Sequence, residues 1–381
     1  MSNIFEKAWG YTLTAFLVIG TIFYLPIKGP VTDPVAYGYW SQEMFFRYGT
    51  IVLLMLSQLF TPLRRLDCKW LSLFVVYLVI SSLIIGFSAT QRHSLLNVFI
   101  WFLLYKTIYE NFRFDQIKKY AFWLGVILFI NFFMCALQYN GIDILFTSVS
   151  EHKPGLLDTV IGFMKIKAFL GLIATLLLPI VVCYAPIFSL CIIPLLFFGV
   201  SSAAIVAVII NSAIMSATML PKRISLAVAA FMLVCGVLFI GLYDAPKGQF
   251  GERLKTWQGT TSLALKGNPI IGKGIGSFKE VNFATMQSNG EPIVWRWVHN
   301  EFIQAFYEIG IIGLVFILGF LAKLQRYFST KDRLLLVLYC SFVSVVVISF
   351  FHFPFHLARF SHLLAFFIAI YHARGVEVKH A

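Results

Sequence analysis

Residues 299–313 read HNEFIQAFYEIGIIG, and the apolar run LVFILGFLA continues them to residue 322. The apolar part has the character of a membrane-spanning helix, and the polar residues lie at its mouth. An ionisable side chain at bilayer depth is costly unless it faces a cavity or a partner. This stretch therefore predicts a membrane helix whose first turns belong to a functional site.

The composition of the whole chain also indicates a membrane protein. Of its 381 residues, 59% are hydrophobic and 12% are charged. A helix needs about 20 apolar residues to cross the hydrocarbon core of a bilayer, and about twelve such stretches can be counted. We predict an all-α polytopic membrane protein with about twelve transmembrane helices, in which residues 1–381 form a single integral membrane domain.

The predicted spans begin near Ala8, Met44, Trp70, Ser94, Tyr120, Lys167, Ile187, Ala203, Ile224, Val298, Leu334 and Phe360. Residues 187–220 could form two short helices that break at Ser201 and Ser202, or one long tilted helix. We take two helices, because this choice keeps the Lys and Arg bias of the inner loops consistent. Both termini are then cytoplasmic, and residues 243–297 form the main periplasmic loop between the ninth and tenth spans.

The outer loops are also basic, which the positive-inside rule does not predict. An outward-facing basic cavity favours an anionic ligand such as phosphate. Arg253, in the stretch GERLKTW near the outer end of the ninth span, is the best candidate for an anion clamp, because a guanidinium can bind two phosphate oxygens at once. Arg296 is a further candidate, although a solvated loop charge is an equal alternative.

Three polar residues in the opening stretch are spaced by four, so Asn300, Gln304 and Glu308 stack on one face of a helix. They form a polar stripe that descends into the membrane from His299, which is the candidate catalytic base. For Gln304 and Glu308, ordinary interhelical hydrogen bonds are the favoured alternative. For His299, we favour the functional interpretation over that of a helix-end histidine.

Glycines mark two other places. Gly310 and Gly313 are expected to let another helix approach closely. Residues 272–276 read GKGIG, but they lack the flanking strand and helix and the Lys-Ser/Thr ending of a nucleotide-binding loop. These glycines more simply permit a tight turn near the site. Just before them, residues 256–266 are expected to form a short helix along the membrane surface.

The stretch FHFPFHLAR at residues 351–359 brings two histidines and an arginine between two helices. A catalytic zinc usually takes three His, carboxylate or Cys ligands, and His352 and His356 have no Glu between them as a zincin helix would. No metal site is therefore expected. His356 and Arg359 are candidates for substrate binding beside His299.

Together these motifs resemble those of the O-antigen ligase and polysaccharide polymerase family of bacterial envelope enzymes. The family's Gly-x-Arg-x-x-x-Trp pattern is matched at residues 251–257, and Asn-Pro-x-x-Gly-x-Gly-x-Gly-x-Phe at residues 268–278. His-Asn-x-x-x-Gln-x-x-x-Glu-x-Gly-x-x-Gly is matched at residues 299–313, and a Phe-Pro-Phe-His turn at residues 353–356. The many-helix layout extends the likeness to the whole chain.

The resemblance implies a metal-independent glycosyltransferase of the C-type membrane architecture, in the bacterial inner membrane with its active site facing the periplasm. Its donor would be a glycan on undecaprenyl pyrophosphate, and its acceptor lipid A-core or a second lipid-linked glycan. It would use no cofactor and bind membrane lipid but no nucleic acid. His299 would orient or deprotonate the acceptor hydroxyl, and Arg253 would stabilise the pyrophosphate leaving group.

One position departs from the family pattern. Family members commonly carry an Arg at the outer end of the seventh helix, where this chain reads SSAA at residues 201–204. A second phosphate-binding cation is therefore missing or relocated, and Lys165 or Lys167 could supply the charge. With these two, the substrate-binding candidates are Arg253, Lys165, Lys167, Arg296, Asn300, Gln304, Glu308, His356 and Arg359.

Three functions fit these observations. A ligase and a polymerase need the same donor site and the same base, and the large outer segment beside His299 favours the ligase by analogy. A protein-glycosylating transferase is a weaker variant. A lipid or polysaccharide transporter would more often show two related halves with broken helices. Because the chain shows no internal repeat and its polar residues cluster at one face, transport is the least favoured function.

Overall fold

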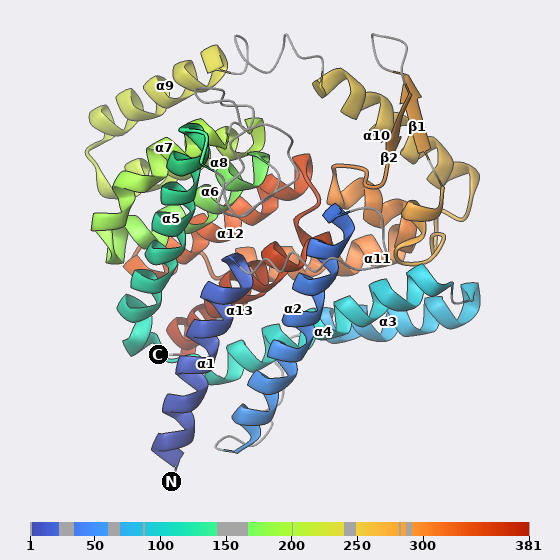
Figure 1. Ribbon diagram of the computed structural model, residues 1–381, viewed down its shortest axis with the longest axis horizontal. Coiled ribbons are helices and arrows are strands. Elements are labelled where there is room, and N and C mark those ends of the chain that lie inside the picture. Colours follow the sequence, from blue (N-terminus) through green and yellow to red (C-terminus); the bar gives the residue numbers. More distant parts are fainter. Residues whose placement is uncertain are drawn as a thin grey trace.

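The computed structural model describes residues 2–22, 34–59, 69–86, 88–142, 167–199, 201–239, 249–281, 283–286 and 292–380. Within these residues the fold is almost entirely helical, with one two-stranded antiparallel sheet (Figure 1). This agrees with the predicted all-α class.

The α-helices are α1 Ser2–Ile22, α2 Pro34–Gln58, α3 Lys69–Ile85, α4 Ala89–Asn111, α5 Ile117–Tyr139, α6 Lys167–Tyr184, α7 Ile192–Phe198, α8 Ser202–Met219, α9 Lys222–Phe239, α10 Gln249–Lys266, α11 Glu301–Gln325, α12 Arg333–Phe351 and α13 Ala358–His380. The shorter elements are the 3-10 helices η1 Phe114–Gln116, η3 Pro186–Cys191, η6 Ser277–Glu280 and η7 Pro354–His356, and the strands β1 Phe283–Met286 and β2 Pro292–Trp295.

The length and hydrophobicity of the helices show a multi-pass membrane protein. In the described part of the chain, three helical segments are long and apolar enough to cross a bilayer, namely Phe114–Tyr139, Glu301–Gln325 and Arg333–Phe351. Several shorter apolar helices accompany them. Each predicted span coincides with a helix or a pair of short helices, but the number of crossings stays a prediction.

The seventh predicted span is not a regular helix. It consists of η3 followed by α7, which has only 7 residues and, at about 1.5 Å per residue, covers a small part of the bilayer. Gly199 follows α7 and lies close against α6, where a Cβ would lie 2.2 Å from the backbone nitrogen of Gly171. α8 then starts at Ser202, so the predicted break at Ser201 and Ser202 is confirmed.

The core of the helical body is built around α13. Its residues from Arg359 to His372 are buried on every side, as expected of a helix surrounded by other helices. α13 packs against α4, α12 and α2, and the aromatic rings of Phe360, Phe366 and Tyr371 lie fully inside. The Pro354 turn that precedes α13 is therefore held against a rigid centre.

The large outer segment folds into a helix, a glycine-rich loop (residues 268–276), η6 and the β-hairpin, which lie together at one side of the helical body above α11 (Figure 1). The surface helix expected at residues 256–266 begins earlier, at Gln249. In the hairpin, Phe283 pairs with Trp295 and Met286 with Pro292. The sequence analysis did not predict these strands.

α11 is broken at Gly310, where φ is 64° and ψ is −172°. The glycine-rich loop fills the break, because the Ile311 N–H donates to the carbonyl of Pro269 at 2.9 Å. From α3, the Tyr77 hydroxyl donates to the carbonyl of Ile309 at 2.6 Å. Irregular backbone at membrane depth is tolerated only where protein covers it or it lines a cavity. Here the loop and Tyr77 provide that cover.

At Gly310, the expected close approach is made by a loop and not by a neighbouring helix, whereas for Gly313 the expectation stays a prediction. A Cβ at Gly310 would lie 2.2 Å from the carbonyl oxygen of Ile270, so a loop and not a helix makes the close approach. A Cβ at Gly313 would first meet the side chain of Ile309 in its own helix, at 2.6 Å.

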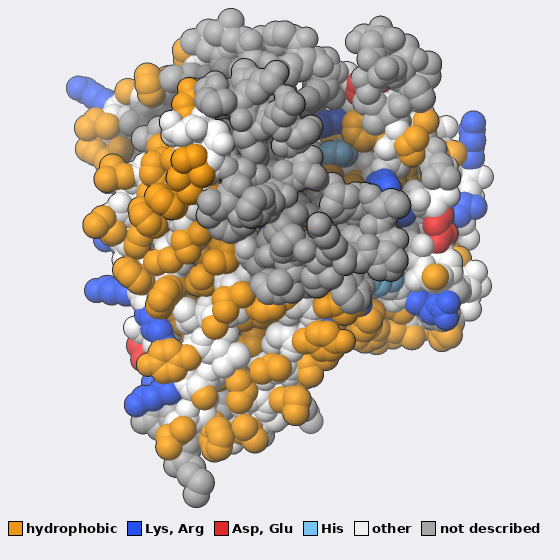
Figure 2. Space-filling view, viewed as in Figure 1, with side chains coloured by type: hydrophobic (Ala, Val, Ile, Leu, Met, Phe, Trp, Pro, Cys, Tyr) orange, Lys and Arg blue, Asp and Glu red, His pale blue; other side chains and the backbone are white. Residues whose placement is uncertain are grey.

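The surface is divided by residue type. Figure 2 shows hydrophobic side chains over α5 and the lower part of α1, with charged side chains along the side that carries α10 and the hairpin. The exposed apolar residues include Phe122, Phe129 and Phe133 of α5. Contiguous apolar surface of this kind suits contact with lipid.

Candidate functional site

The polar stripe of α11 begins with a helix cap. Asn300 is the N-cap residue, and its side-chain oxygen accepts hydrogen bonds from the N–H groups of Phe302 and Ile303, each at 3.0 Å. Asn is favoured at this position because its side chain satisfies amide groups that have no partner within the helix. Asn300 is buried, so it fixes the start of α11 directly beside His299.

Gln304 and Glu308 form a buried hydrogen-bond network one and two turns further on. The Gln304 amide nitrogen donates to a Glu308 carboxylate oxygen at 3.0 Å, and its amide oxygen accepts from the Val298 N–H at 3.1 Å. The Glu308 carboxylate also accepts from the N–H groups of Gly276, at 2.7 Å, and Phe278, at 3.4 Å. The two side chains therefore tie α11 to the start of η6.

The glycine-rich loop makes the tight turn that the sequence predicts. Gly272, Gly274 and Gly276 all have positive φ, at 77°, 99° and 78°, a conformation that glycine adopts without strain. The Gly274 N–H donates to the Glu308 carbonyl at 2.8 Å. The loop therefore contacts α11 through its backbone rather than through its side chains.

His299 occupies the turn between the hairpin and α11. It is the one described non-glycine residue with positive φ, at 58°, a conformation that is uncommon for such residues and is often found at functional sites. Its ring packs edge-on against Trp295, at 5.2 Å between ring centroids, and against Phe353, at 4.7 Å. No described residue forms a hydrogen bond with its Nδ1 atom.

The environment of His299 keeps the imidazole neutral. Burial, followed by the nearby Arg253 cation, lowers the pKa of His299 to about 3. A histidine with its ordinary pKa near 6.5 would be partly protonated at neutral pH. At neutral pH His299 is therefore a neutral imidazole, and the ring nitrogen that carries no hydrogen can accept a proton.

Arg253 lies in the first turns of α10 and not at the end of the ninth span, because α9 ends at Phe239 and α10 begins at Gln249. One turn further along α10, the Trp257 indole donates to the carbonyl of Val298 at 3.0 Å. This bond brings α10 against the turn that carries His299. The Arg253 charge lowers the pKa of both His299 and His352, so this cation lies near both imidazoles, and its role as an anion clamp stays a prediction.

His352 is a second buried histidine beside His299, at 5.9 Å between ring centroids. Burial, with smaller effects of Arg253 and His299, lowers the pKa of His352 well below its ordinary value. Its Nε2 atom lies 3.4 Å from the hydroxyl of Ser201. Ser201 begins the SSAA stretch at which the family pattern has an arginine. The structure thus brings the departing position next to the predicted site.

His356 faces the other way and forms an ion pair. Its Nδ1 atom lies 3.1 Å from the Glu301 carboxylate, and its Nε2 atom lies 3.0 Å from the amide nitrogen of Gln304. Burial alone would lower its pKa, but Glu301 more than offsets this effect, so the pKa of His356 is raised. The Trp297 ring separates His356 from His299, because it contacts His356 at 4.7 Å and stacks on Phe353 at 5.3 Å.

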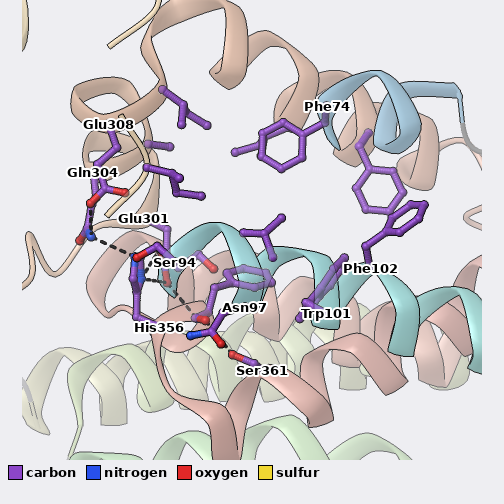
Figure 3. Close-up of a pocket in the computed structure, with 18 of the residues that line it drawn as sticks. Phe74, Ser94, Asn97, Trp101, Phe102, Glu301, Gln304, Glu308, His356 and Ser361 are labelled. Carbon is purple, nitrogen blue, oxygen red and sulfur yellow. Dashed lines mark hydrogen bonds and ion pairs between the residues drawn. The ribbon is translucent and has the colours of Figure 1, made fainter. Parts of the chain in front are cut away.

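A cavity of about 230 Å³ opens beside His356. Figure 3 shows its polar end, with Glu301, Gln304, Asn97 and His356, and its aromatic end, with Phe74, Trp101 and Phe102. Lys279 and Glu43 also line this cavity, and neither was selected from the sequence. Lys279 directly follows Phe278, the last residue of the glycine-rich motif at residues 268–278, and this position was the signal that could have identified it.

The remaining candidates are more dispersed. Arg296 is exposed on the turn after β2, whereas Arg359 is buried at the start of α13. Lys167 is the first residue of α6, and Lys165 lies outside the described residues. Within the described part of the chain, no group of three His, Cys, Asp or Glu side chains has the arrangement of a metal site.

The fold and these contacts define a multi-pass helical membrane protein with a neutral histidine and an arginine beside its outer loop segment. Residues 159–318 match the family model described as O-antigen ligase. This match supports an assignment to the O-antigen ligase and polymerase family, and the matched part of the chain includes Arg253, the glycine-rich loop and His299. No curated protein matches the chain closely enough to add to this assignment.

Proposed function

We propose that the protein is a glycosyltransferase of the O-antigen ligase type, which transfers a glycan from undecaprenyl pyrophosphate to lipid A-core at the periplasmic face of the inner membrane. The observation that carries the proposal is the position of His299 relative to Arg253. The neutral, half-buried imidazole of His299 lies close enough to Arg253 for that charge to lower its pKa, and no described residue forms a hydrogen bond with its Nδ1 atom. Base and cation are the two groups that this transfer requires.

The reaction needs a proton acceptor at the attacking hydroxyl. The acceptor oxygen forms a bond to the anomeric carbon as the bond from that carbon to the pyrophosphate oxygen breaks, and the hydroxyl proton passes to His299. General-base assistance of this kind contributes roughly two to four orders of magnitude in rate. A bound pyrophosphate would raise the pKa of His299, because its negative charge favours the imidazolium.

Arg253 acts on the leaving group. Negative charge grows on the departing pyrophosphate as the glycosidic bond breaks, and a fixed cation stabilises that charge in the transition state. The family match and the position of Arg253 on α10 support this role. No step of the proposed reaction requires a metal ion.

The same donor site would serve a polymerase, in which the acceptor is a second lipid-linked glycan. We favour the ligase because the large outer segment packs directly on the turn that carries His299 through the Trp257 to Val298 hydrogen bond. The acceptor distinguishes the two activities.

The test is glycan transfer by the purified protein in nanodiscs, with a lipid-linked oligosaccharide, with and without lipid A-core, and with EDTA present. We expect conjugation to lipid A-core that survives EDTA and falls by at least about 100-fold in His299→Ala. His380→Ala is the matched control, because His380 is exposed at the end of α13. Longer lipid-linked chains in place of conjugation would establish a polymerase, and unchanged transfer by His299→Ala would refute the proposed base.

A further inference from the structure

The cavity beside His356 has two chemically different ends. Its apolar wall follows α11 from Ala305 to Leu321 and includes Phe74 of α3 and Trp101 and Phe102 of α4 (Figure 3). The apolar residues of this wall lie on both sides of the break at Gly310, with Ala305 and Ile309 before it and Ile317, Phe320 and Leu321 after it. This apolar part of the cavity, which we call the channel, suits one hydrocarbon chain.

The polar end is rich in carboxylates. Among the described residues that line the cavity, Glu43, Glu301 and Glu308 are acidic, Lys279 is the one lysine, and arginine is absent. The fifth ionisable group is His356, which is paired with Glu301 at 3.1 Å. Glu43 also has a cation beside it, because Arg47 lies 3.8 Å from its carboxylate. Two of the three carboxylates are thus already paired, and the described lining offers no cluster of cations to a phosphate or pyrophosphate, which favours an uncharged head group.

Glu43 is held in place by a network that the proposed reaction does not use. The Asn97 amide donates to one Glu43 oxygen at 2.9 Å, and His93 Nε2 lies 2.7 Å from the other. Arg47 in turn donates twice to the Asn97 oxygen, at 2.9 and 2.8 Å. A carboxylate can accept about four hydrogen bonds, so Glu43 keeps capacity for a hydroxyl donor in the cavity.

Lys279 and Trp297 complete this end. The Lys279 ammonium lies 4.1 Å from the centroid of the Trp297 ring, and none of the hydrogen bonds between described residues uses its three donors. The ring of Trp297 stacks on Phe353, at 5.3 Å between centroids. These two rings form a wall between the acidic cavity and the site of His299 and Arg253.

From this arrangement we propose that the cavity is a second lipid site, which binds a single-chain lipid with an uncharged, hydroxyl-bearing sugar head. The chain occupies the channel along α11, and the sugar hydroxyls donate to Glu43 and accept from Lys279. The site is separate from the cationic site that we propose for the pyrophosphate. Binding here does not depend on the proposed transfer activity, so it can be tested without turnover.

The test uses two photoreactive probes with the same farnesyl chain, one with a glucoside head and one with a phosphate head, added to the protein in nanodiscs. Cross-linked peptides are mapped by mass spectrometry. We expect the glucoside to label the peptides of α4 and α11 that line the cavity, at least tenfold more strongly than the phosphate does. Equal or stronger labelling of these peptides by the phosphate would overturn the proposal.

Cavity-filling variants provide the structural control. Val98→Phe and Ala305→Phe fill the channel from two different helices, and we expect each to reduce glucoside labelling at least tenfold. Leu96→Phe and Ile312→Phe place the same side chain on exposed surfaces of the same two helices, and they should label like the wild type. Unchanged labelling in both filling variants would exclude the channel as the binding site.

Glu43→Gln tests the head-group contact without filling the channel. The glutamine keeps the shape of the side chain but is a weaker acceptor, because hydrogen bonds to ionised groups are roughly twice as strong as those between neutral groups. We expect a severalfold loss of glucoside labelling and an unchanged Tm. This variant also keeps the proposal testable if a filling variant does not fold, and undiminished labelling would remove Glu43 from the site.

Discussion

Replacing Gly310 by alanine is the substitution whose effect follows most directly from the backbone. With φ at 64° and ψ at −172°, Gly310 adopts a conformation that essentially only glycine tolerates. The added Cβ would lie 2.2 Å from the Ile270 carbonyl oxygen and 2.7 Å from the Gly272 nitrogen. Both atoms are backbone, so neither can rotate away. The glycine-rich loop must therefore leave the break.

The cost has two parts. Backbone strain at such a position is worth about 1–3 kcal/mol. Displacing the loop breaks the hydrogen bonds from the N–H groups of Ile311 and Ile312 to the carbonyls of Pro269 and Ile270, at about 1 kcal/mol each. The total destabilisation is about 3–5 kcal/mol, which would lower Tm by at least about 5 °C on the scaling known for large soluble domains.

The assay is thermal unfolding of the purified protein in detergent, together with glycan transfer. Gly251→Ala is the matched control, because a Cβ at Gly251 in α10 would meet nothing within 4 Å and alanine favours helix. We expect Gly310→Ala to lose both stability and transfer, and Gly251→Ala to keep both. If the two variants unfold within about 1 °C of each other, the loop does not hold the break in α11.

Three further outcomes follow from the same contacts. Asn300→Ala should lower the free energy of unfolding by about 1 kcal/mol through loss of the helix cap, whereas Asn300→Asp should retain most of it; equal effects of both would argue against the cap. The pKa of His299 is about 3, and protonation removes the base. We therefore expect kcat/KM to show no fall caused by His299 between pH 7 and about 5. The acid limb of kcat should lie at higher pH, because the bound pyrophosphate raises this pKa, and coincident limbs would contradict that coupling. Finally, EDTA should leave the transfer rate unchanged, and a rate restored only by added Mg²⁺ or Zn²⁺ would refute metal independence.

Hydropathy predicted the helical class, and the motifs placed Arg253 and His299 in one expected site. Both depend on information that is local in the chain, namely the length of apolar runs and the residues of a contiguous motif. The spacing of Asn300, Gln304 and Glu308 likewise predicted a single polar face, which α11 presents as a cap followed by a buried network. The favoured alternative for Gln304 and Glu308, ordinary buried hydrogen bonding, describes their observed contacts.

The break in α11 and the acidic cavity were not predictable in the same way. Gly310 is compatible with a regular helix, and its conformation follows only from the loop that lies against it about 40 residues earlier in the chain. Glu43 joins the cavity by pairing with residues of α4, about 50 positions away. Such contacts depend on the tertiary arrangement of helices, which periodicity does not report.

The break in α11 also constrains the order in which the protein is assembled. The glycine-rich loop is synthesised before α11, yet the amide groups that bind it, such as that of Ile311, lie inside α11. The loop can therefore dock only after α11 has been synthesised. Because the Glu308 carboxylate accepts from the Gly276 N–H across this contact, the site reaches its final geometry only once both segments are present.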